Sequence, residues 1–162
     1  MKMRKILTLL LSAAVSVAAC SDNDSVPGVI TLPEPPIDGQ TVFRYDTYGD
    51  EVFWTDVLRF NEVVATLSPE TALAVGLKVD AEAVPADVLA NADLTDPATT
   101  IALLGLDAVV GIKADVAADG TVSRFGITCA LCHSDVDDSV APGIGVRMDG
   151  WPAKDLDPGL II

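Results

Sequence analysis

The sequence predicts a mainly α domain made of several short helices and one β-hairpin, with a loop-rich segment after the hairpin. Three observations lead to this expectation. Apolar residues recur at helical spacing between residues 50 and 66, and capping residues followed by proline mark further helix starts. A two-residue alternation, typical of strands, appears over residues 109–128. The segment after residue 133 has little periodicity and is rich in Asp, Gly and Pro.

The first residues predict export and a lipid anchor. Residues 1–19 combine a positively charged start with an apolar run over residues 6–17, which is too short to span a bilayer stably. The small residues before Cys20 resemble the lipobox of bacterial lipoproteins, which implies cleavage before Cys20 and its acylation. Ser21 favours the periplasmic side of the outer membrane over the inner membrane. An ordinary signal peptide that leaves Cys20 as a free thiol is the alternative.

A proline-rich tether is expected to follow the leader over residues 20–42. Four prolines and two glycines in this stretch interrupt any regular element. Proline-rich segments behave as semi-extended spacers, so this one would hold the folded part away from the membrane surface. The folded domain is expected over residues 43–162.

The first helix of the domain is expected between residues 50 and 66. Phe53, Val57, Phe60 and Val64 recur along it at helical spacing. The spacing predicts one apolar face, and these aromatic side chains are expected to belong to the core rather than to a cofactor site.

Capping signals predict three more short helices. Ser68-Pro69 and Asp96-Pro97 each place an N-cap residue before a proline at the first helical position. Glycines at positions 76 and 105 would end these helices, and residues 85–91 repeat the signal on a smaller scale.

A β-hairpin is predicted over residues 109–128. Asp119-Gly120 is a signal for a two-residue type I′ turn, which fixes the register of the two strands. The expected cross-strand pairs are Val116 with Ser123, Ala114 with Phe125, Ile112 with Ile127, and Asp115 with Arg124. The last pair is opposite in charge, which supports this register, and the second strand leads directly to residue 129.

Residues 129–133, Cys-Ala-Leu-Cys-His, carry the pattern of covalent haem attachment. In c-type haem proteins the two thiols form thioethers with the porphyrin, and the following histidine becomes an axial iron ligand. We therefore expect Cys129 and Cys132 to bind haem c and His133 to ligate its iron. A zinc site would need four Cys or His ligands, and a redox-active dithiol would sit in a βαβ context. The chain has one histidine, and its third cysteine is Cys20.

The segment after His133 is expected to wrap the haem as a loop. Asp135, Asp137 and Asp138 form a calcium site in one interpretation, and a solvated loop face in the favoured one. Trp151-Pro152 is expected either to pack on the porphyrin or to anchor the loop.

The charge of the chain is strongly acidic. Residues 1–19 contain three of the ten basic residues and none of the 24 acidic ones, so the net charge changes from −14 to −17 on cleavage before Cys20. A surface of this sign repels nucleic acid, and none is expected as a partner. It would attract a basic redox partner, although acidity that merely keeps an exported protein soluble explains it equally well.

Residues 100–162 resemble the N-terminal haem domain of bacterial di-haem cytochrome c peroxidases. The likeness is carried by Leu103-Leu104-Gly105-Leu106, by residues 126–133, and by Asp149-Gly150-Trp151-Pro152 with Asp155-Leu156. The resemblance implies a haem domain from a class of proteins with two haems, in which one haem accepts electrons and the other binds peroxide. This chain has one haem motif. Its apolar end, Leu160-Ile161-Ile162, is expected either to form a terminal strand or, in the favoured interpretation, to show that the domain over residues 43–162 is incomplete at its C-terminus.

Two functions follow from these observations. The first is electron transfer by a lipid-anchored c-type cytochrome, whose protein part sets the potential of the iron. The alternative is the haem-binding portion of a di-haem peroxidase-like oxidoreductase, so enzymatic activity is left open. A strong sixth iron ligand favours the first and an open position favours the second. Charged neighbours at 147 and 149 predict that Met148 does not bind the iron, and Lys154 would first have to lose its proton.

Overall fold

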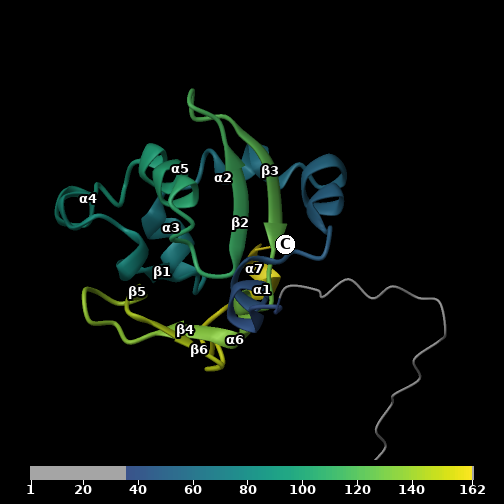
Figure 1. Ribbon diagram of the computed structural model, residues 1–162. Coiled ribbons are helices and arrows are strands. Elements are labelled where there is room, and N and C mark those ends of the chain that lie inside the picture. Colours follow the sequence, from purple (N-terminus) through teal and green to yellow (C-terminus); the bar gives the residue numbers. More distant parts are fainter. Residues whose placement is uncertain (1–35, 162) are drawn as a thin grey trace, which may run out of the picture. The chain divides into compact units, whose positions relative to one another are not determined.

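The computed structural model describes residues 36–161 (Figure 1). The expected signal peptide, the lipid-attachment residue Cys20 and most of the tether lie outside these residues. Of the described part, 40% is helical and 18% is strand. The expectation of a mainly α domain is therefore wrong, since helices and small sheets are mixed. None of the described helices is long and apolar enough to cross a membrane.

The helices and strands are short and alternate along the chain. Helices precede the hairpin: α1 (Gly39–Tyr45), the π-helix η1 (Val52–Val57), α2 (Phe60–Val64), α3 (Pro69–Ala74), the 3₁₀ helix η2 (Ala81–Ala83), α4 (Ala86–Asn91) and α5 (Pro97–Gly105). The strands are β1 (Val79–Asp80), β2 (Ile112–Val116), β3 (Val122–Ile127), β4 (Ser134–Val136), β5 (Ile144–Gly145) and β6 (Arg147–Asp149), and the last helices are α6 (Ala130–His133) and α7 (Pro158–Ile161).

The strands form three two-stranded sheets in the described residues. β2 and β3 pair antiparallel, β4 and β6 pair antiparallel, and β1 and β5 pair in parallel. Strands β1, β4, β5 and β6 are two or three residues long, which is too short for the alternation that reveals a strand in sequence. This is the physical reason why the sequence predicted one hairpin and a loop-rich end.

The hairpin has the predicted register over most of its length. Ile112 lies opposite Ile127, Ala114 opposite Phe125, and Asp115 opposite Arg124. The register shifts after Asp115, so that Val116 pairs with Val122 and not with Ser123 as predicted. A bulge of this kind places an extra residue in one strand without moving the pairs before it.

The turn accounts for this shift. The Ala117 carbonyl accepts a hydrogen bond from the Gly120 amide at 2.9 Å, and the Ala117 amide donates to the Thr121 carbonyl at 2.9 Å. Gly120 has a φ of +85°, whereas Asp119 keeps a negative φ and its carboxylate accepts from the Thr121 amide. The predicted two-residue type I′ turn is wrong, because that turn needs positive φ at both positions.

The region predicted as one helix over residues 50–66 is split in two. Arg59, with a φ of +56°, separates the π-helix η1 from α2. Phe60 and Val64 pack in the core as expected, but Phe53 and Val57 are 50% and 64% exposed. Because a π-helix bonds residue i to residue i+5, side chains at α-helical spacing no longer share one face.

Polar side chains from this region cover the outer edge of β3. The Thr55 hydroxyl accepts from the Phe125 amide at 2.9 Å and donates to the Phe125 carbonyl at 3.2 Å. The Asp50 carboxylate accepts from the Ile127 amide at 3.2 Å, and the Asn61 amide donates to the Val122 carbonyl at 3.2 Å. These contacts replace a third strand, so the edge keeps few unpaired backbone groups.

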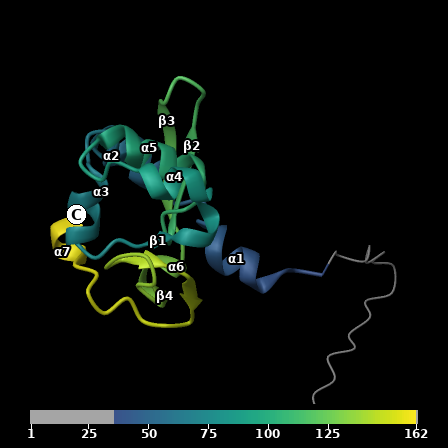
Figure 2. The same cartoon turned by 90° about the vertical axis from the view of Figure 1, so that its left-hand side faces the viewer.

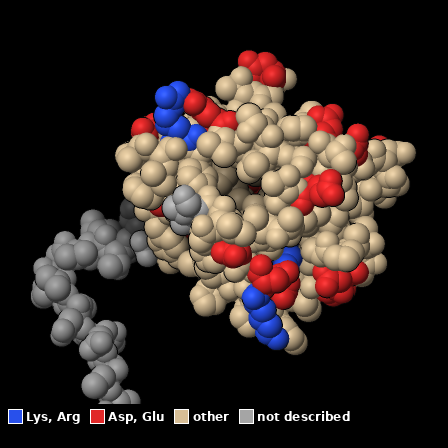
Figure 3. All heavy atoms as spheres, turned by 180° about the vertical axis from the view of Figure 1, so that it is seen from behind, with Lys and Arg blue, Asp and Glu red and all other residues tan. Residues whose placement is uncertain are grey.

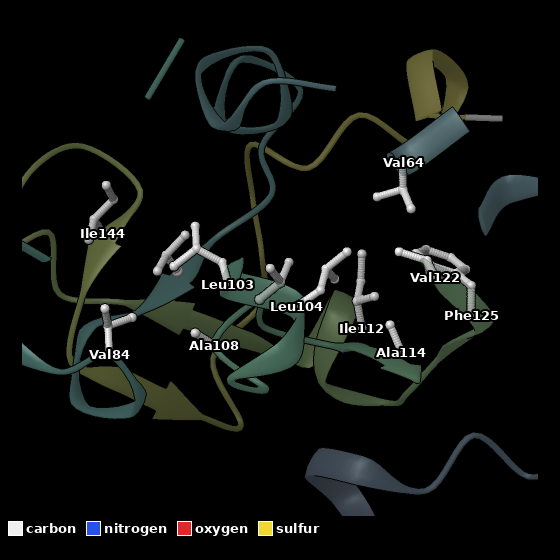
Figure 4. Close-up of a cluster of buried hydrophobic side chains, with 12 residues drawn as sticks. Val64, Val84, Leu103, Leu104, Ala108, Ile112, Ala114, Val122, Phe125 and Ile144 are labelled. Atoms are coloured by element: carbon white, nitrogen blue, oxygen red, sulfur yellow. The ribbon is translucent and has the colours of Figure 1, made fainter. Parts of the chain in front are cut away.

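The core lies between α5 and the hairpin. Figure 4 shows Leu103 and Leu104 of α5 beside Ile112 of β2, with Phe125 of β3 close to Val122. Leu104 is 2% exposed and Phe125 3%. The predicted caps hold α3 and α5, since the side chains of Ser68 and Asp96 accept amide hydrogen bonds at the starts of these helices. The hairpin and α5 thus form an apolar scaffold for the residues that follow.

The segment with the expected haem motif lies at one end of this scaffold. Figures 1 and 2 place α6 and β4 at the end of the β2–β3 hairpin, with α1 beside α6. The first helix therefore comes close to residues 129–133, although it lies about 90 residues earlier in the chain.

Candidate functional site

The two cysteines and the histidine of the expected motif share one face of α6. Cys129 is the N-cap residue, and Cys132 and His133 follow at positions i+3 and i+4, which bring side chains together on a helix. All three side chains are exposed and both thiols are free. The two residues between the cysteines turn inward, since Ala130 is fully buried and Leu131 packs against the core.

The base of the hairpin holds α6 in place. The Thr128 amide donates to the Gly111 carbonyl at 2.9 Å, and the Thr128 hydroxyl accepts from the Ala130 amide at 3.3 Å. Gly111 has a φ of +78°, and a Cβ built on it would lie 2.1 Å from the Cα of Leu131. A glycine is therefore required where the hairpin meets the motif, both for its φ and for the close approach of two backbones.

The segment expected as a loop returns to the motif as a strand. β6 pairs with β4, so that Asp149 lies opposite Ser134, directly after His133. The Gly150 amide then donates to the His133 carbonyl at 2.8 Å, and the Ala153 amide donates to the Cys132 carbonyl at 3.1 Å. These bonds satisfy carbonyls at the C-terminal end of α6.

Trp151 is held beside the motif by the same hydrogen bonds. It lies between Gly150 and Ala153, which bind the backbone of α6, and it is 56% exposed. Trp151 is thus an exposed apolar side chain on a segment whose backbone is bonded to α6.

Asp149 connects α1 to this end of the molecule. Its carboxylate accepts from Arg44 at 2.7 Å, from Gln40 at 3.1 Å and from the Ser134 hydroxyl at 3.0 Å. Burial acts to raise the pKa of Asp149, but these hydrogen bonds and the charge of Arg147 outweigh it and lower the pKa. The ionised carboxylate thus holds α1 against β4 and β6.

Tyr48 is a second neighbour of the motif that the sequence did not indicate. The Cys129 side chain, as a hydrogen-bonding and then as a charged neighbour, raises the pKa of Tyr48. The residue has a φ of +55° and is 70% exposed. Only the Tyr-Gly pair at 48–49 could have signalled a turn here, and nothing in the sequence relates that turn to Cys129.

The acidic residues after the motif bind backbone amides of their own loop. Asp137 accepts from the amides of Ser139 and Val146 at 3.1 and 2.8 Å, and Asp138 accepts from the Gly143 amide at 2.7 Å. Hydrogen bonds with Ser139 and Val146 lower the pKa of Asp137. Within residues 36–161 no three His, Cys, Asp or Glu side chains are grouped so as to hold a metal ion.

Met148 lies on β6, on the strand pair that follows the motif. It is half-buried and pairs with Asp135 of β4. Its neighbours Arg147 and Asp149 form an ion pair, with 3.0 Å between Nε and Oδ1. The charged surroundings expected from the sequence are thus present around Met148.

The described residues fit a covalently bound haem. Two free thiols and one imidazole are exposed together on α6. An open depression of about 370 Å³ is lined in part by Gly150, whose amide donates to the His133 carbonyl. The residues that line it come from α1 and from the segment that returns to α6: Gly39, Gln40, Phe43, Asp149 and Gly150. Phe43, which lines this depression, also packs against the buried cluster that contains Ala130.

Comparisons with protein-family models, with curated proteins and with solved structures found no match to this chain. The resemblance to the di-haem peroxidase haem domain therefore stays a prediction. Functional interpretation depends on the chemistry of residues 129–133 and on their surroundings.

Proposed function

We propose that this protein is an exported c-type cytochrome that binds one haem covalently and transfers electrons. The observation that carries the proposal is the arrangement of α6, where Cys129, Cys132 and His133 are exposed on one helix face. His133 is the only histidine of the chain, and it follows the second cysteine directly, as haem c attachment requires.

Each residue of the site has a definite role in this proposal. The thiols of Cys129 and Cys132 form the thioether bonds, and the imidazole of His133 serves as the proximal ligand. When bound, haem c supplies a one-electron iron couple whose potential depends on ligation, burial and hydrogen bonding. Trp151 and Phe43 would shield the group from water, and Asp149 would keep α1 in position next to it.

The proposal includes a lipid anchor and a redox partner. Acylation of Cys20 would tie the protein to the membrane, on the periplasmic side of the outer membrane or, alternatively, of the inner membrane. Acidic side chains are spread over the face of the molecule in Figure 3, where basic ones are few. A basic redox protein is the kind of partner that such a surface attracts.

The test is expression in a host that attaches haem to cytochromes c. Wild type is expected to show the spectrum of haem c and to keep its haem in acidified organic solvent. Cys132→Ala should release the haem or yield no holoprotein, whereas Cys20→Ser should keep the haem and lose incorporation of labelled palmitate. A wild-type protein without covalent haem contradicts the proposal, and equal palmitate labelling of wild type and Cys20→Ser contradicts the anchor.

A further inference from the structure

The π-helix η1 and the turn before it present apolar side chains to solvent. Four of the eleven large apolar side chains that are exposed within residues 36–161 lie in one ten-residue segment: Tyr48, Val52, Phe53 and Val57. Val52 and Val57 are five residues apart in η1, so they lie on the same side of it. Single exposed apolar side chains are ordinary, whereas a group of them marks an interaction site. We name these four residues the η1 surface.

The opposite side of η1 is fixed to the scaffold. The Trp54 ring packs edge-on against Phe53 and Phe60, with centroids 5.2 and 5.3 Å apart. Phe60 packs in turn on the buried Phe125, and the Thr55 hydroxyl binds the Phe125 backbone. The inner side of the helix is thus occupied by Trp54 and Thr55, and the exposed side chains have no place in the core.

The η1 surface begins beside the residues of the proposed haem site. Tyr48 neighbours the side chain of Cys129, the first of the two proposed thioether residues. Val52 follows Tyr48 by four residues, a chain length of at most about 14 Å. Between them, the Asp50 carboxylate accepts from the amide of Ile127, two residues before Cys129, at 3.2 Å. A protein seated on the η1 surface would therefore lie next to the Cys129 end of the motif.

The rim of the η1 surface is acidic. Asp46 and Asp56 are exposed near its two ends. Glu51 lies between them, and the hydrogen bond that its carboxylate accepts from the Thr47 hydroxyl at 2.6 Å lowers its pKa. All three carboxylates are therefore ionised at neutral pH and stand beside apolar side chains.

The arginines of this region are matched by further acidic residues. Arg59 pairs with Glu62, and Arg124 lies opposite Asp115 in the hairpin. Arg124 also attracts Glu51, so one rim carboxylate has a cation in its vicinity. The surroundings of the η1 surface remain negative overall.

These charges decide between the possible occupants of the η1 surface. A second copy would bring the same acidic rim against itself, and like charges that face each other oppose association. Anionic lipid headgroups are repelled for the same reason. A protein with cations around an apolar contact area complements both the rim and the centre.

We propose that the η1 surface docks a basic redox protein whose cations surround an apolar contact area. The exposed apolar side chains would form the water-free centre of the interface, and the acidic residues its charged rim. One electron passes between the haem iron and the partner, so that one is oxidised by one electron as the other is reduced by one. This inference rests on the proposed function, because it needs haem at residues 129–133.

The test uses holoprotein and mitochondrial cytochrome c, a basic one-electron protein, as the probe. Val57→Lys is compared with Val140→Lys, since both replace an exposed valine and add one positive charge. Val140 lies in the loop between β4 and β5. Asp56→Asn is compared in the same way with Asp87→Asn, at an exposed position of α4.

Covalent haem is measured first in the wild type. Its absence overturns the proposed function and this inference together, whereas normal haem content allows the inference to fail alone. Binding is then followed by NMR titration of ¹⁵N-labelled holoprotein at low ionic strength, with both proteins oxidised so that no electron is transferred.

The amide signals of residues 46–57 are expected to shift or broaden when the probe is added. The Kd should rise about tenfold in Val57→Lys, because the lysine repels the probe and disrupts the apolar contact. Asp56→Asn should raise the Kd about twofold to threefold, and Asp87→Asn and Val140→Lys should stay close to wild type. The rate constant for electron transfer to the oxidised probe should fall in the same order.

Several results would overturn the inference. They are equal changes of Kd in Val57→Lys and Val140→Lys, amide shifts confined to residues outside 46–57, and no binding of the probe at low ionic strength. A dimer of the holoprotein that Val57→Lys abolishes would assign the η1 surface to a second copy, and loss of binding to anionic lipid vesicles in the same variant would assign it to a membrane. If Val57→Lys does not fold, the amide shifts and the pair Asp56→Asn and Asp87→Asn decide the matter.

Discussion

Two regions that contact the β2–β3 hairpin, one around α5 and one around α6, are stabilised by different interactions. On the side of α5, the contacts are almost entirely apolar, with Leu104, Ile112 and Phe125 each less than 10% exposed. On the side of α6, a carboxylate at Asp149 joins α1, β4 and β6, and the buried Lys78 pairs with Asp155. The first region is a scaffold and the second presents reactive side chains.

The stability of the two regions should respond differently to pH and to the loss of side-chain volume. Apolar burial depends little on pH, whereas hydrogen bonds to a carboxylate are lost when it is protonated. The region that carries Cys129, Cys132 and His133 should therefore be the pH-sensitive part of the fold, and the region around α5 should be the part most sensitive to loss of volume.

The largest effect is expected from Phe125→Ala in the apolar region. Phe125 is 3% exposed and its ring packs 5.9 Å from that of Phe60. Removing a buried aromatic ring should lower the free energy of unfolding by about 3–5 kcal/mol, measured by urea denaturation. Phe53→Ala, at a ring that is 50% exposed, is the control and should change stability much less. Equal losses in the two variants would contradict the assignment of the core.

Gly111→Ala should break the contact between the two regions. The added Cβ would lie 2.1 Å from the Leu131 Cα, and alanine is disfavoured at a φ of +78°. Overpacking and backbone strain together should lower the free energy of unfolding by roughly 2–5 kcal/mol. Gly49→Ala is a matched control, since Gly49 has a φ of +81° and no atom within 4 Å of the Cβ position. If both variants lose the same amount, the close approach to α6 has no energetic role.

Asp149→Asn should reduce the pH dependence of stability in the motif region. Because the pKa of Asp149 is lowered in the folded state, its contribution to stability is present above its unfolded pKa of about 3.9 and is lost as pH falls through the folded value. At neutral pH the variant should lose about 1–3 kcal/mol, since Arg44 loses its ionised acceptor and Arg147 loses its ion-pair partner.

The measurement for Asp149 is urea denaturation of wild type and variant from pH 7 to pH 3. The difference between the two should shrink as the pH falls, because wild type then loses the same interaction. Asp115→Asn, at an exposed position of β2, is the control and should follow wild type at every pH. A difference that is constant from pH 7 to pH 3 would rule out a role for the charge.

The smallest change in stability is expected from Asp96→Ala, in a helix cap of the apolar region. The Asp96 carboxylate accepts from the Ala98 amide at 2.9 Å at the start of α5. Loss of an N-cap should lower the free energy of unfolding by about 1 kcal/mol. The haem content of the variant should equal that of wild type, since the cap hydrogen bond joins Asp96 to Ala98 and involves no residue of 129–133. A variant without haem would show that haem attachment at residues 129–133 depends on the stability of α5.

Met148→Ala is expected to leave the iron spectrum unchanged. Met148 is half-buried on β6 with an ion pair on the opposite face of its strand. If methionine bound the iron, the oxidised holoprotein would show the weak long-wavelength band of methionine–iron bonding, and Met148→Ala would abolish it. That outcome would contradict the prediction and would favour a closed electron-transfer site over peroxide chemistry.

Local signals in the sequence were sufficient for the scaffold and for the identity of the reactive residues. The cross-strand pairs were predicted by counting outward from Asp119-Gly120, and Ile112–Ile127, Ala114–Phe125 and Asp115–Arg124 are confirmed. They hold although the turn is of another type, because the register shift lies between these pairs and the turn. The caps at Ser68 and Asp96 act within one helical turn, so they too were visible in sequence. The spacing of Cys129, Cys132 and His133 determined that they share a face.

The surroundings of the reactive residues were decided by the tertiary structure alone. Tyr48 lies next to Cys129 although the two residues are far apart in the chain. The pairing of β4 with β6, which buries Arg147, involves strands of only three residues. Strands of this length are too short to show an alternation of apolar and polar residues. They are stabilised by hydrogen bonds between distant segments, from the Ser134 hydroxyl to Asp149 and from the Gly150 amide to the His133 carbonyl. Contacts between segments stabilise these strands, so a local pattern of residues cannot predict them.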